Sequence, residues 1–184
     1  DLYEKGEISQ KELQTQRFET LFSTLGVQGD AFQANGRYLD QLGEEEKLLD
    51  GAEWLCKTLS PYCRLSIVTN GISRSQHRRL ENSALRSYIS DLFISEDLGY
   101  QKPQKEYFDA VFARLEGFSR QQAIILGDSL ASDIAGGIAA GIDTCWYHPS
   151  GTSSIHPATY EIHSLYDFAK IVLAENLFTE HPQL

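Results

Sequence analysis

The spacing of apolar residues along the chain changes near residue 50. Before it, Leu21, Phe22 and Leu25 recur at the three- and four-residue intervals of an amphipathic helix, and Gly26 can end that helix. A second helix is predicted over residues 30–42. The first part of the chain is therefore expected to be helical throughout.

From residue 51 onward, short apolar runs typical of β-strands alternate with helical patterns. The predicted strands are residues 64–69, 91–95, 123–126, 143–147 and, as a short one, 159–162. The predicted helices are residues 52–59, one from about Ser75, one opening at Pro103, one ending near Gly141, and residues 165–174. This alternation predicts an α/β fold in which a parallel sheet is connected by crossover helices.

Composition and charge narrow the classes of function. With 184 residues and 41% hydrophobic content, the chain can bury one sizeable core and carry a small appended subdomain. A formal net charge of −10 disfavours a nucleic acid polymer or a membrane surface as the main partner. The chain has neither an apolar run approaching the roughly 20 residues of a membrane span nor a signal-peptide pattern at its start. We therefore expect a soluble, cytoplasmic protein that acts on a small molecule.

The three cysteines agree with that compartment. Cys56, Cys63 and Cys145 lie at or beside apolar segments and show no paired spacing. Reduced thiols are therefore expected.

Candidate chemistry gathers directly after the predicted strands, because ligands of open parallel sheets bind at the carboxyl ends of the strands. Thr69 and Asn70 follow one strand, and Gly71 allows the backbone to turn into the next helix. A hydroxyl, an amide and free N–H groups form a cradle for a phosphate or carboxylate. The alternative is an ordinary strand-to-helix turn, for which Thr-Asn-Gly is a common sequence.

A lysine precedes the next helix. Lys102 comes immediately before Pro103, which suits the first position of a helix. A cation at that end opposes the helix dipole, so a functional reason for it is expected. Lys102 could hold an anionic group or a nucleophilic carboxylate, and the alternative is a solvated surface lysine.

Two carboxylates follow the third long strand. Asp128 and Asp133 are five positions apart and can turn toward one pocket. Like charges this close repel unless a cation is present, and carboxylate oxygens suit Mg²⁺. The alternative is that Asp128 caps the following helix while Asp133 faces water. Gly136 and Gly137 each weaken that helix by roughly 1 kcal/mol, which is expected where it packs closely on the sheet.

Together these motifs resemble a known family. They are Thr69 after a strand, Lys102 before Pro103, and Asp128 with Asp133 five positions later. Their order and spacing are similar to those of the second, third and fourth motifs of the haloacid-dehalogenase superfamily of phosphohydrolases. The stretches VTNG, GYQKP and GDSLASDIAGGIAAGIDTCWY resemble its pyrimidine 5′-nucleotidase branch.

The resemblance implies a domain division and a reaction. Residues 51–184 would form a three-layer, Rossmann-like parallel-sheet core, and residues 1–50 would be the larger part of an inserted helical cap, incomplete at its N-terminus. The implied activity is Mg²⁺-dependent hydrolysis of small phosphate monoesters through an aspartyl-phosphate, with pyrimidine nucleoside 5′-monophosphates as the expected substrates. The implied roles are metal binding by Asp128 and Asp133, catalysis by Thr69 and Lys102, and substrate binding by Thr69, Asn70, Gly71, Lys102 and, from the cap, Arg17.

One family motif has no counterpart in the sequence. The first motif, Asp-x-Asp-x-Thr, supplies the nucleophile at the end of a strand that the family places between those ending at Thr69 and Asp128. Neither Asp1 nor Asp30 follows an apolar strand, and the chain contains no methionine. We therefore expect the nucleophile and the central first strand to belong to an N-terminal segment of the parent protein, and residues 1–184 to be inactive alone.

Other functions remain open at this point. A sugar phosphatase or a phosphomutase would use the same core. A non-catalytic binding or partner-dependent module is the alternative of another class, because no nucleophile is present. A dehalogenase is disfavoured, since its metal-free chemistry would leave the paired carboxylates unexplained. The oligomeric state is not indicated.

Overall fold

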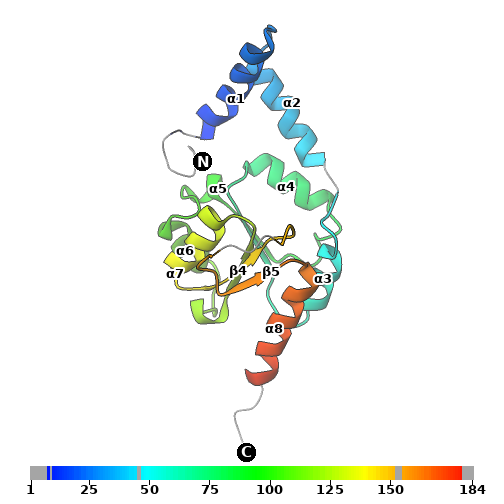
Figure 1. Ribbon diagram of the computed structural model, residues 1–184, viewed down its shortest axis with the longest axis vertical. Coiled ribbons are helices and arrows are strands. Elements are labelled where there is room, and N and C mark those ends of the chain that lie inside the picture. Colours follow the sequence, from blue (N-terminus) through cyan, green and yellow to red (C-terminus); the bar gives the residue numbers. More distant parts are fainter. Residues whose placement is uncertain (1–7, 9, 45–46, 152–154, 180–184) are drawn as a thin grey trace, which may run out of the picture.

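The computed structural model of the protein describes residues 8, 10–44, 47–151 and 155–179. Two helices, α1 (Gln10–Leu25) and α2 (Ala31–Glu44), form a pair at one end of an elongated molecule (Figure 1). The remaining elements form an α/β core, and the C-terminal helix projects from its opposite end. The predicted change from a helical segment to an α/β segment is thus confirmed.

Local capping explains where the two N-terminal helices meet. The Asp30 carboxylate accepts hydrogen bonds from the backbone N–H groups of Phe32 (2.9 Å) and Gln33 (3.0 Å), so α2 begins immediately after it. Gly26 has a φ of 64° directly after α1, a conformation that glycine adopts without steric cost. The turn between the helices is therefore fixed by residues within it.

All strands of the core run parallel, as predicted. They are β1 (Ser66–Thr69), β2 (Asp91–Ile94), β3 (Ile124–Gly127), β4 (Asp143–Tyr147) and β5 (Tyr160–Ile162). They form two sheets, one of β1 and β2 and one with the order β3-β4-β5.

The two sheets are separated between β1 and β3, which is where the resemblance places the missing first strand. Among the described residues, no ladder joins β1 to β3. All four residues of β1 are only partly buried, whereas Ile94 on β2 and Cys145 on β4 are 0% exposed. The β1 strand therefore lacks the cover that interior strands of a parallel sheet normally have.

Helices cover both faces of the strands. The core helices are α3 (Ala52–Leu59), α4 (Ser73–Asn82), α5 (Ser95–Leu98), α6 (Lys105–Phe112), α7 (Ala135–Ala140) and α8 (Leu165–Thr179). The chain also makes a 3₁₀ turn over Arg120–Gln122 and a π-helical turn over Leu130–Ile134.

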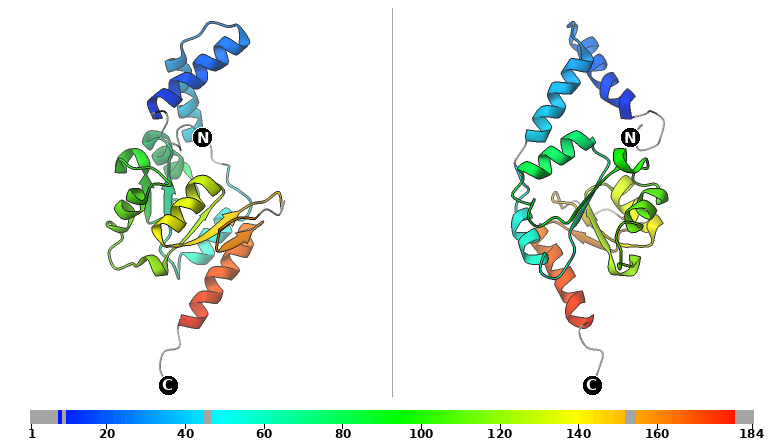
Figure 2. Two further views of the ribbon diagram at one scale, coloured as in Figure 1. Left: turned by 60° about the vertical axis from the view of Figure 1, so that its left-hand side comes forward. Right: turned by 180° about the vertical axis from the view of Figure 1, so that it is seen from behind.

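Two apolar clusters hold these layers together. On one face, Leu59 of α3 and Phe168 of α8 pack with Cys145. On the other, Phe108 of α6 packs with Ile125 of β3 and with α7. The views in Figure 2 show α3 and α8 on one side of the strands and α6 and α7 on the other. The core is therefore the three-layer α/β arrangement expected from the resemblance.

The close packing of α7 on the sheet explains why Gly137 occurs in this helix although glycine weakens it. A Cβ atom at Gly137 would lie 2.6 Å from Thr144 Cγ2 and 2.7 Å from Ile125 Cγ2. Only glycine allows the helix to approach the sheet this closely. The expectation of close helix–sheet packing at this position is confirmed.

Two predicted helix boundaries are wrong, since α8 continues to Thr179 instead of ending at residue 174, and α6 starts later than expected. The helix expected to open at Pro103 begins at Lys105 instead. Residues 101–104 form a turn in which Gln104 N donates to Gln101 O at 2.8 Å, and the Lys102–Pro103 peptide bond is cis. Since this turn precedes α6, Lys102 lies in the loop before the helix and not next to its first residue.

Two other expectations concern thiols and membranes. All three cysteines are reduced thiols, as predicted, and burial raises the pKa of the Cys145 thiol to about 12. Within the described ranges, every helix is too short or too polar to span a bilayer.

Candidate functional site

Lys102 connects the ends of the two sheets. Its Nζ atom lies 2.9 Å from the backbone oxygen of Val68 on β1 and 2.6 Å from Oδ1 of Asp133, just after β3. Both Lys102 and Asp133 are only 7% exposed. The alternatives of a solvated lysine and a water-facing Asp133 are therefore wrong, and the two residues form a buried ion pair.

The side chain of Asn70 fixes the backbone of Lys102. Asn70 Nδ2 donates to Lys102 O at 2.9 Å, and Lys102 N donates to Asn70 Oδ1 at 2.8 Å. This two-point contact ties the loop after β1 to the loop before α6. Asn70 thus positions Lys102, and its expected contact with substrate stays a prediction.

The hydroxyl of Tyr107 joins β1 to β2 beneath Thr69. It accepts a hydrogen bond from Thr69 N at 3.0 Å and donates one to Phe93 O at 2.8 Å. Tyr107 is fully buried, and burial raises the pKa of its phenol, so the hydroxyl stays protonated and can donate. This role of Tyr107 is not predictable from the sequence, because its partners lie 38 and 14 positions away and no local pattern marks them.

Thr69 and Gly71 form the turn that was predicted at the end of β1. Thr69 Oγ1 accepts a hydrogen bond from Gly71 N at 3.0 Å. The hydroxyl proton of Thr69 is not used in that bond, so the group can still donate to a ligand oxygen. The turn therefore presents a hydroxyl donor one residue after Val68, whose backbone oxygen accepts from the Lys102 ammonium.

Asp133 is held against the end of β3 by two local features. Ser129 N donates to Asp133 Oδ2 at 3.2 Å, while Ser129 Oγ accepts from Ser132 N and caps the π-helical turn. A Cβ atom at Gly127 would lie 2.4 Å from the Asp133 side chain, so only glycine leaves room for it. The residue that caps this turn is Ser129, and the alternative that Asp128 does so is wrong.

Asp128 lies at the exposed rim of the site. Its backbone oxygen accepts a hydrogen bond from Trp146 Nε1 at 3.0 Å, which fixes the end of β3, and the residue is exposed to solvent. Exposed carboxylate oxygens next to the buried Asp133 are hard donors that suit Mg²⁺, with water or substrate as further ligands. The described residues include no cluster of three or more His, Cys, Asp or Glu side chains that could hold a metal. This pair would therefore supply only part of a coordination shell.

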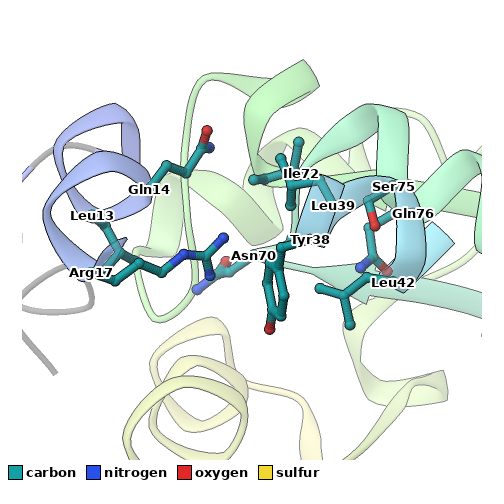
Figure 3. Close-up of a pocket in the computed structure, with 11 residues that line it drawn as sticks. Leu13, Gln14, Arg17, Tyr38, Leu39, Leu42, Asn70, Ile72, Ser75 and Gln76 are labelled. Atoms are coloured by element: carbon teal, nitrogen blue, oxygen red, sulfur yellow. The ribbon is translucent and has the colours of Figure 1, made fainter. Parts of the chain in front are cut away.

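A pocket of about 240 Å³ lies between the helical pair and the core (Figure 3). Arg17 lines it from α1 and Tyr38 from α2, while Asn70 and Gly71 line it from the core. The guanidinium of Arg17 lies 4.3 Å from the centre of the Tyr38 ring. Asn70 and Gly71 line the pocket and also directly follow β1. The pocket therefore adjoins the ends of the strands.

The predicted site residues thus fall into three groups. Thr69, Lys102 and Asp133 lie together at the strand ends, and Asp128 lies at their rim. Asn70 and Gly71 line the pocket from the core, and Arg17 lines it from α1.

Comparison with known proteins identifies the family. The model of the haloacid dehalogenase-like hydrolase family matches residues 3–147. The HAD-hydrolase YfnB of Bacillus subtilis is 40% identical over 176 residues, covering 95% of this chain and 75% of that protein. The pyrimidine 5′-nucleotidase PynA of Streptococcus pneumoniae is 39% identical and covers 87% of this chain and 69% of that protein. The pyrimidine 5′-nucleotidase YjjG of Escherichia coli is 34% identical, with 92% and 76% covered.

Solved structures agree with these matches. The crystal structure of YfnB bound to magnesium superimposes with a TM-score of 0.87, covering 93% of this chain and 76% of that one. A 2-haloacid dehalogenase from Pseudomonas syringae, 23% identical, shares the fold with a TM-score of 0.65. The family model, the relatives and the fold agree, and the chain therefore belongs to the haloacid dehalogenase-like hydrolase family.

Proposed function

We propose that this protein is a phosphatase that hydrolyses nucleoside 5′-monophosphates, pyrimidine nucleotides foremost. The observation that carries the proposal is the buried Lys102, held by Asp133 and the Val68 carbonyl beside the Thr69 turn. Two relatives that match more than four fifths of the chain are pyrimidine 5′-nucleotidases. The cation and hydroxyl donors supply the phosphate-binding chemistry that such a reaction needs.

The chain's own residues would act on the phosphoryl oxygens. The Lys102 ammonium has three donors, two of which contact Val68 O and Asp133, so a third can reach a ligand oxygen. The Thr69 hydroxyl would donate to a second oxygen. Preorganised donors of this kind stabilise the negative charge that spreads over the phosphoryl group during transfer.

Asp128 and Asp133 would hold Mg²⁺, which neutralises phosphate charge when bound. Asp128 has exposed oxygens for this role, and Asp133 would contribute a lone pair beyond its bonds to Lys102 and Ser129. The attacking carboxylate would come from a further strand placed between β1 and β3. Among the described residues, these two strands have no neighbour on the sides that would face it.

A phosphate-release assay on the full-length protein tests the proposal. We expect UMP and dUMP to be hydrolysed with higher kcat/KM than hexose phosphates or phosphoglycolate, and with a requirement for Mg²⁺. Asp128→Asn should abolish turnover at saturating Mg²⁺ while leaving the fold intact. Asp143→Asn is the matched control, because this exposed carboxylate lies at the opposite end of β4 from the site.

Two results would contradict the proposal. If sugar phosphates are hydrolysed with higher kcat/KM than every nucleotide, the protein belongs to another branch of the family. Full activity of Asp128→Asn would remove that residue from metal binding.

A further inference from the structure

The indole of Trp146 holds the backbone at Asp128, one of the two carboxylates proposed to bind Mg²⁺. Trp146 lies on β4, and its Nε1 atom donates to the backbone oxygen of Asp128 at 3.0 Å. Gly127 and Trp146 are register partners in the ladder of β3 and β4, so the indole reaches the first residue beyond β3. Trp146 is only 6% exposed, and its N–H group therefore depends on Asp128 for a hydrogen-bond partner.

The carboxylate of Asp128 has less support than that of Asp133. Asp133 is held by Lys102 Nζ at 2.6 Å and by Ser129 N at 3.2 Å. Within the described part of the chain, no group hydrogen-bonds the carboxylate of Asp128. The place of its oxygens is therefore set by the backbone at Asp128, which the indole holds.

Two histidine rings hold the indole in turn. The imidazole of His148 stacks on Trp146, with ring centres 4.3 Å apart and planes 9° from parallel. His156 meets the indole edge-on, with ring centres 4.7 Å apart. His148 N donates to Ile162 O at 2.8 Å, which ties the residue after β4 to the end of β5. The indole is thus restrained by its neighbours as well as by its own hydrogen bond.

His156 is fixed by two hydrogen bonds of its own. Ala158 N donates to His156 Nδ1 at 3.3 Å, and a ring nitrogen that accepts carries no proton. His156 Nε2 therefore carries the proton of a neutral ring and donates to Glu161 Oε2 at 2.8 Å. Glu161 is the register partner of Trp146 in the ladder of β4 and β5. The strand pairing that places the indole therefore also places the group that anchors its neighbour.

We propose that Trp146 is a positioning residue for Mg²⁺, whose indole N–H, through the backbone of Asp128, sets the distance between the carboxylates of Asp128 and Asp133. This inference rests on the metal role proposed for those two residues. Mg²⁺ demands near-ideal octahedral geometry, so a small displacement of one oxygen ligand weakens binding. Loss of a group that orients a metal ligand typically costs about 10–100-fold in metal affinity. Loss of this hydrogen bond should therefore weaken Mg²⁺ binding and leave the groups that contact the phosphate unchanged.

Two substitutions remove the N–H donor. Replacement of Trp146 by 3-benzothienylalanine exchanges the indole N–H for sulfur and keeps the fused ring that contacts His148 and His156. Trp146→Phe removes the donor together with part of the ring. Trp54→Phe is the matched control, because that indole is 44% exposed on α3 and contacts the ring of Tyr166 on α8.

The first measurement is metal binding by the full-length protein without substrate. Mn²⁺, which suits the same oxygen ligands, is the probe, because the electron paramagnetic resonance signal of the free ion falls on binding. Mg²⁺ is then titrated as the competitor. We expect both Trp146 variants to bind Mn²⁺ and Mg²⁺ about tenfold more weakly than the wild-type protein, and Trp54→Phe to bind them within about twofold of it.

The second measurement is hydrolysis of UMP at varied Mg²⁺. The Mg²⁺ concentration that gives half the maximal rate should rise about tenfold in both Trp146 variants. The kcat at saturating Mg²⁺ and the KM for UMP should stay within about twofold of the wild-type values. A merely structural role of Trp146 would instead lower kcat at saturating Mg²⁺, and that result would overturn the proposal.

The remaining outcomes separate this inference from the proposed function. Wild-type metal affinity in the benzothienylalanine variant overturns the positioning role while the phosphatase function stands. Unchanged metal affinity in Asp128→Asn would show that this carboxylate does not hold the ion, and the inference would fail. If the wild-type protein hydrolyses no phosphate monoester, the proposed function fails, and the Mn²⁺ titration still decides the role of Trp146.

Discussion

At the scale of single residues, the strand ends depend on the buried pair of Lys102 and Asp133. Each side chain is about nine-tenths buried, and each is satisfied by the other together with a backbone group. Removing one partner of such a pair leaves an uncompensated charge in a poorly solvated place. The pair is thus expected to stabilise the fold in addition to its proposed role in phosphate and metal binding.

Lys102→Met should lower the free energy of unfolding by about 3–5 kcal/mol, because Asp133 stays buried without its cation. The measurement is urea denaturation. Adding Asp133→Asn to that variant should restore part of the loss, because the stranded charge is removed.

Lys170→Met serves as the reference for this substitution. The ion pair of Lys170 with Asp167 is exposed, with 77% of the lysine side chain accessible, and its loss should cost less than about 1 kcal/mol. An equal effect of the two lysine substitutions would show that the Lys102 pair does not stabilise the fold.

At the scale of elements, polar contacts at the start of β2 fix its pairing with β1. Asp91 receives two hydrogen bonds from Arg64, at 2.7 and 2.6 Å, and one from Ser66 Oγ at 2.7 Å. Ser66 and Asp91 are also register partners in the ladder. The hydrogen bonds from Arg64 and Ser66 hold the pKa of Asp91 below its ordinary value of 3.8, although partial burial opposes them.

The lowered pKa of Asp91 gives a pH dependence with a definite sign. Its contribution to stability is fully present above the unfolded-state pKa, near 3.8, and is lost as the pH falls through the lower folded-state pKa. Asp91→Asn should therefore lower the unfolding free energy by a constant amount, about 1–3 kcal/mol, between about pH 5 and pH 7. The difference from the wild-type protein should shrink below about pH 4. A difference that stays constant down to about pH 3 would contradict the assignment.

At the scale of the whole molecule, the described strands form two sheets, and the helical pair of α1 and α2 contacts the core helix α4. Arg74 and Arg78 of α4 pair with Asp40 and Glu44 of α2, each nearest contact measuring 2.6 Å. These pairs are exposed, so salt screens them. These two ion pairs between α2 and α4 should therefore contribute less to stability than the buried contacts within the core.

Hydrogen exchange on a polypeptide of residues 1–184 measures the consequence of the divided sheet. Amides of β4, which pairs on both sides, should exchange most slowly, while those of β1 and β3, each paired on one side, should exchange faster. Equal protection of β1 and β4 would mean that another strand covers the open edge of β1.

The sequence by itself determined the elements and the places where chemistry gathers. Apolar periodicity located α3 and β4 to the residue, and the residues after β1 and β3 were identified because parallel strands present their carboxyl ends at one edge. The motif spacing was also sufficient to identify the family. Thr69 ends one strand, Lys102 precedes a helix and Asp128 follows a later strand, in the order that the family motifs have. Patterns of this kind are local, and each is visible within a short window.

Only the tertiary structure decided how these side chains are used. The pairing of Lys102 with Asp133 spans 31 positions, and the contact of Tyr107 with Thr69 spans 38, so neither leaves a local signal. The hydrogen bond from Trp146 to the backbone oxygen of Asp128 joins β4 to the end of β3 across 18 positions. Hydrogen bonds and burial depend on which elements pack together, and packing brings together residues whose separation in sequence is arbitrary.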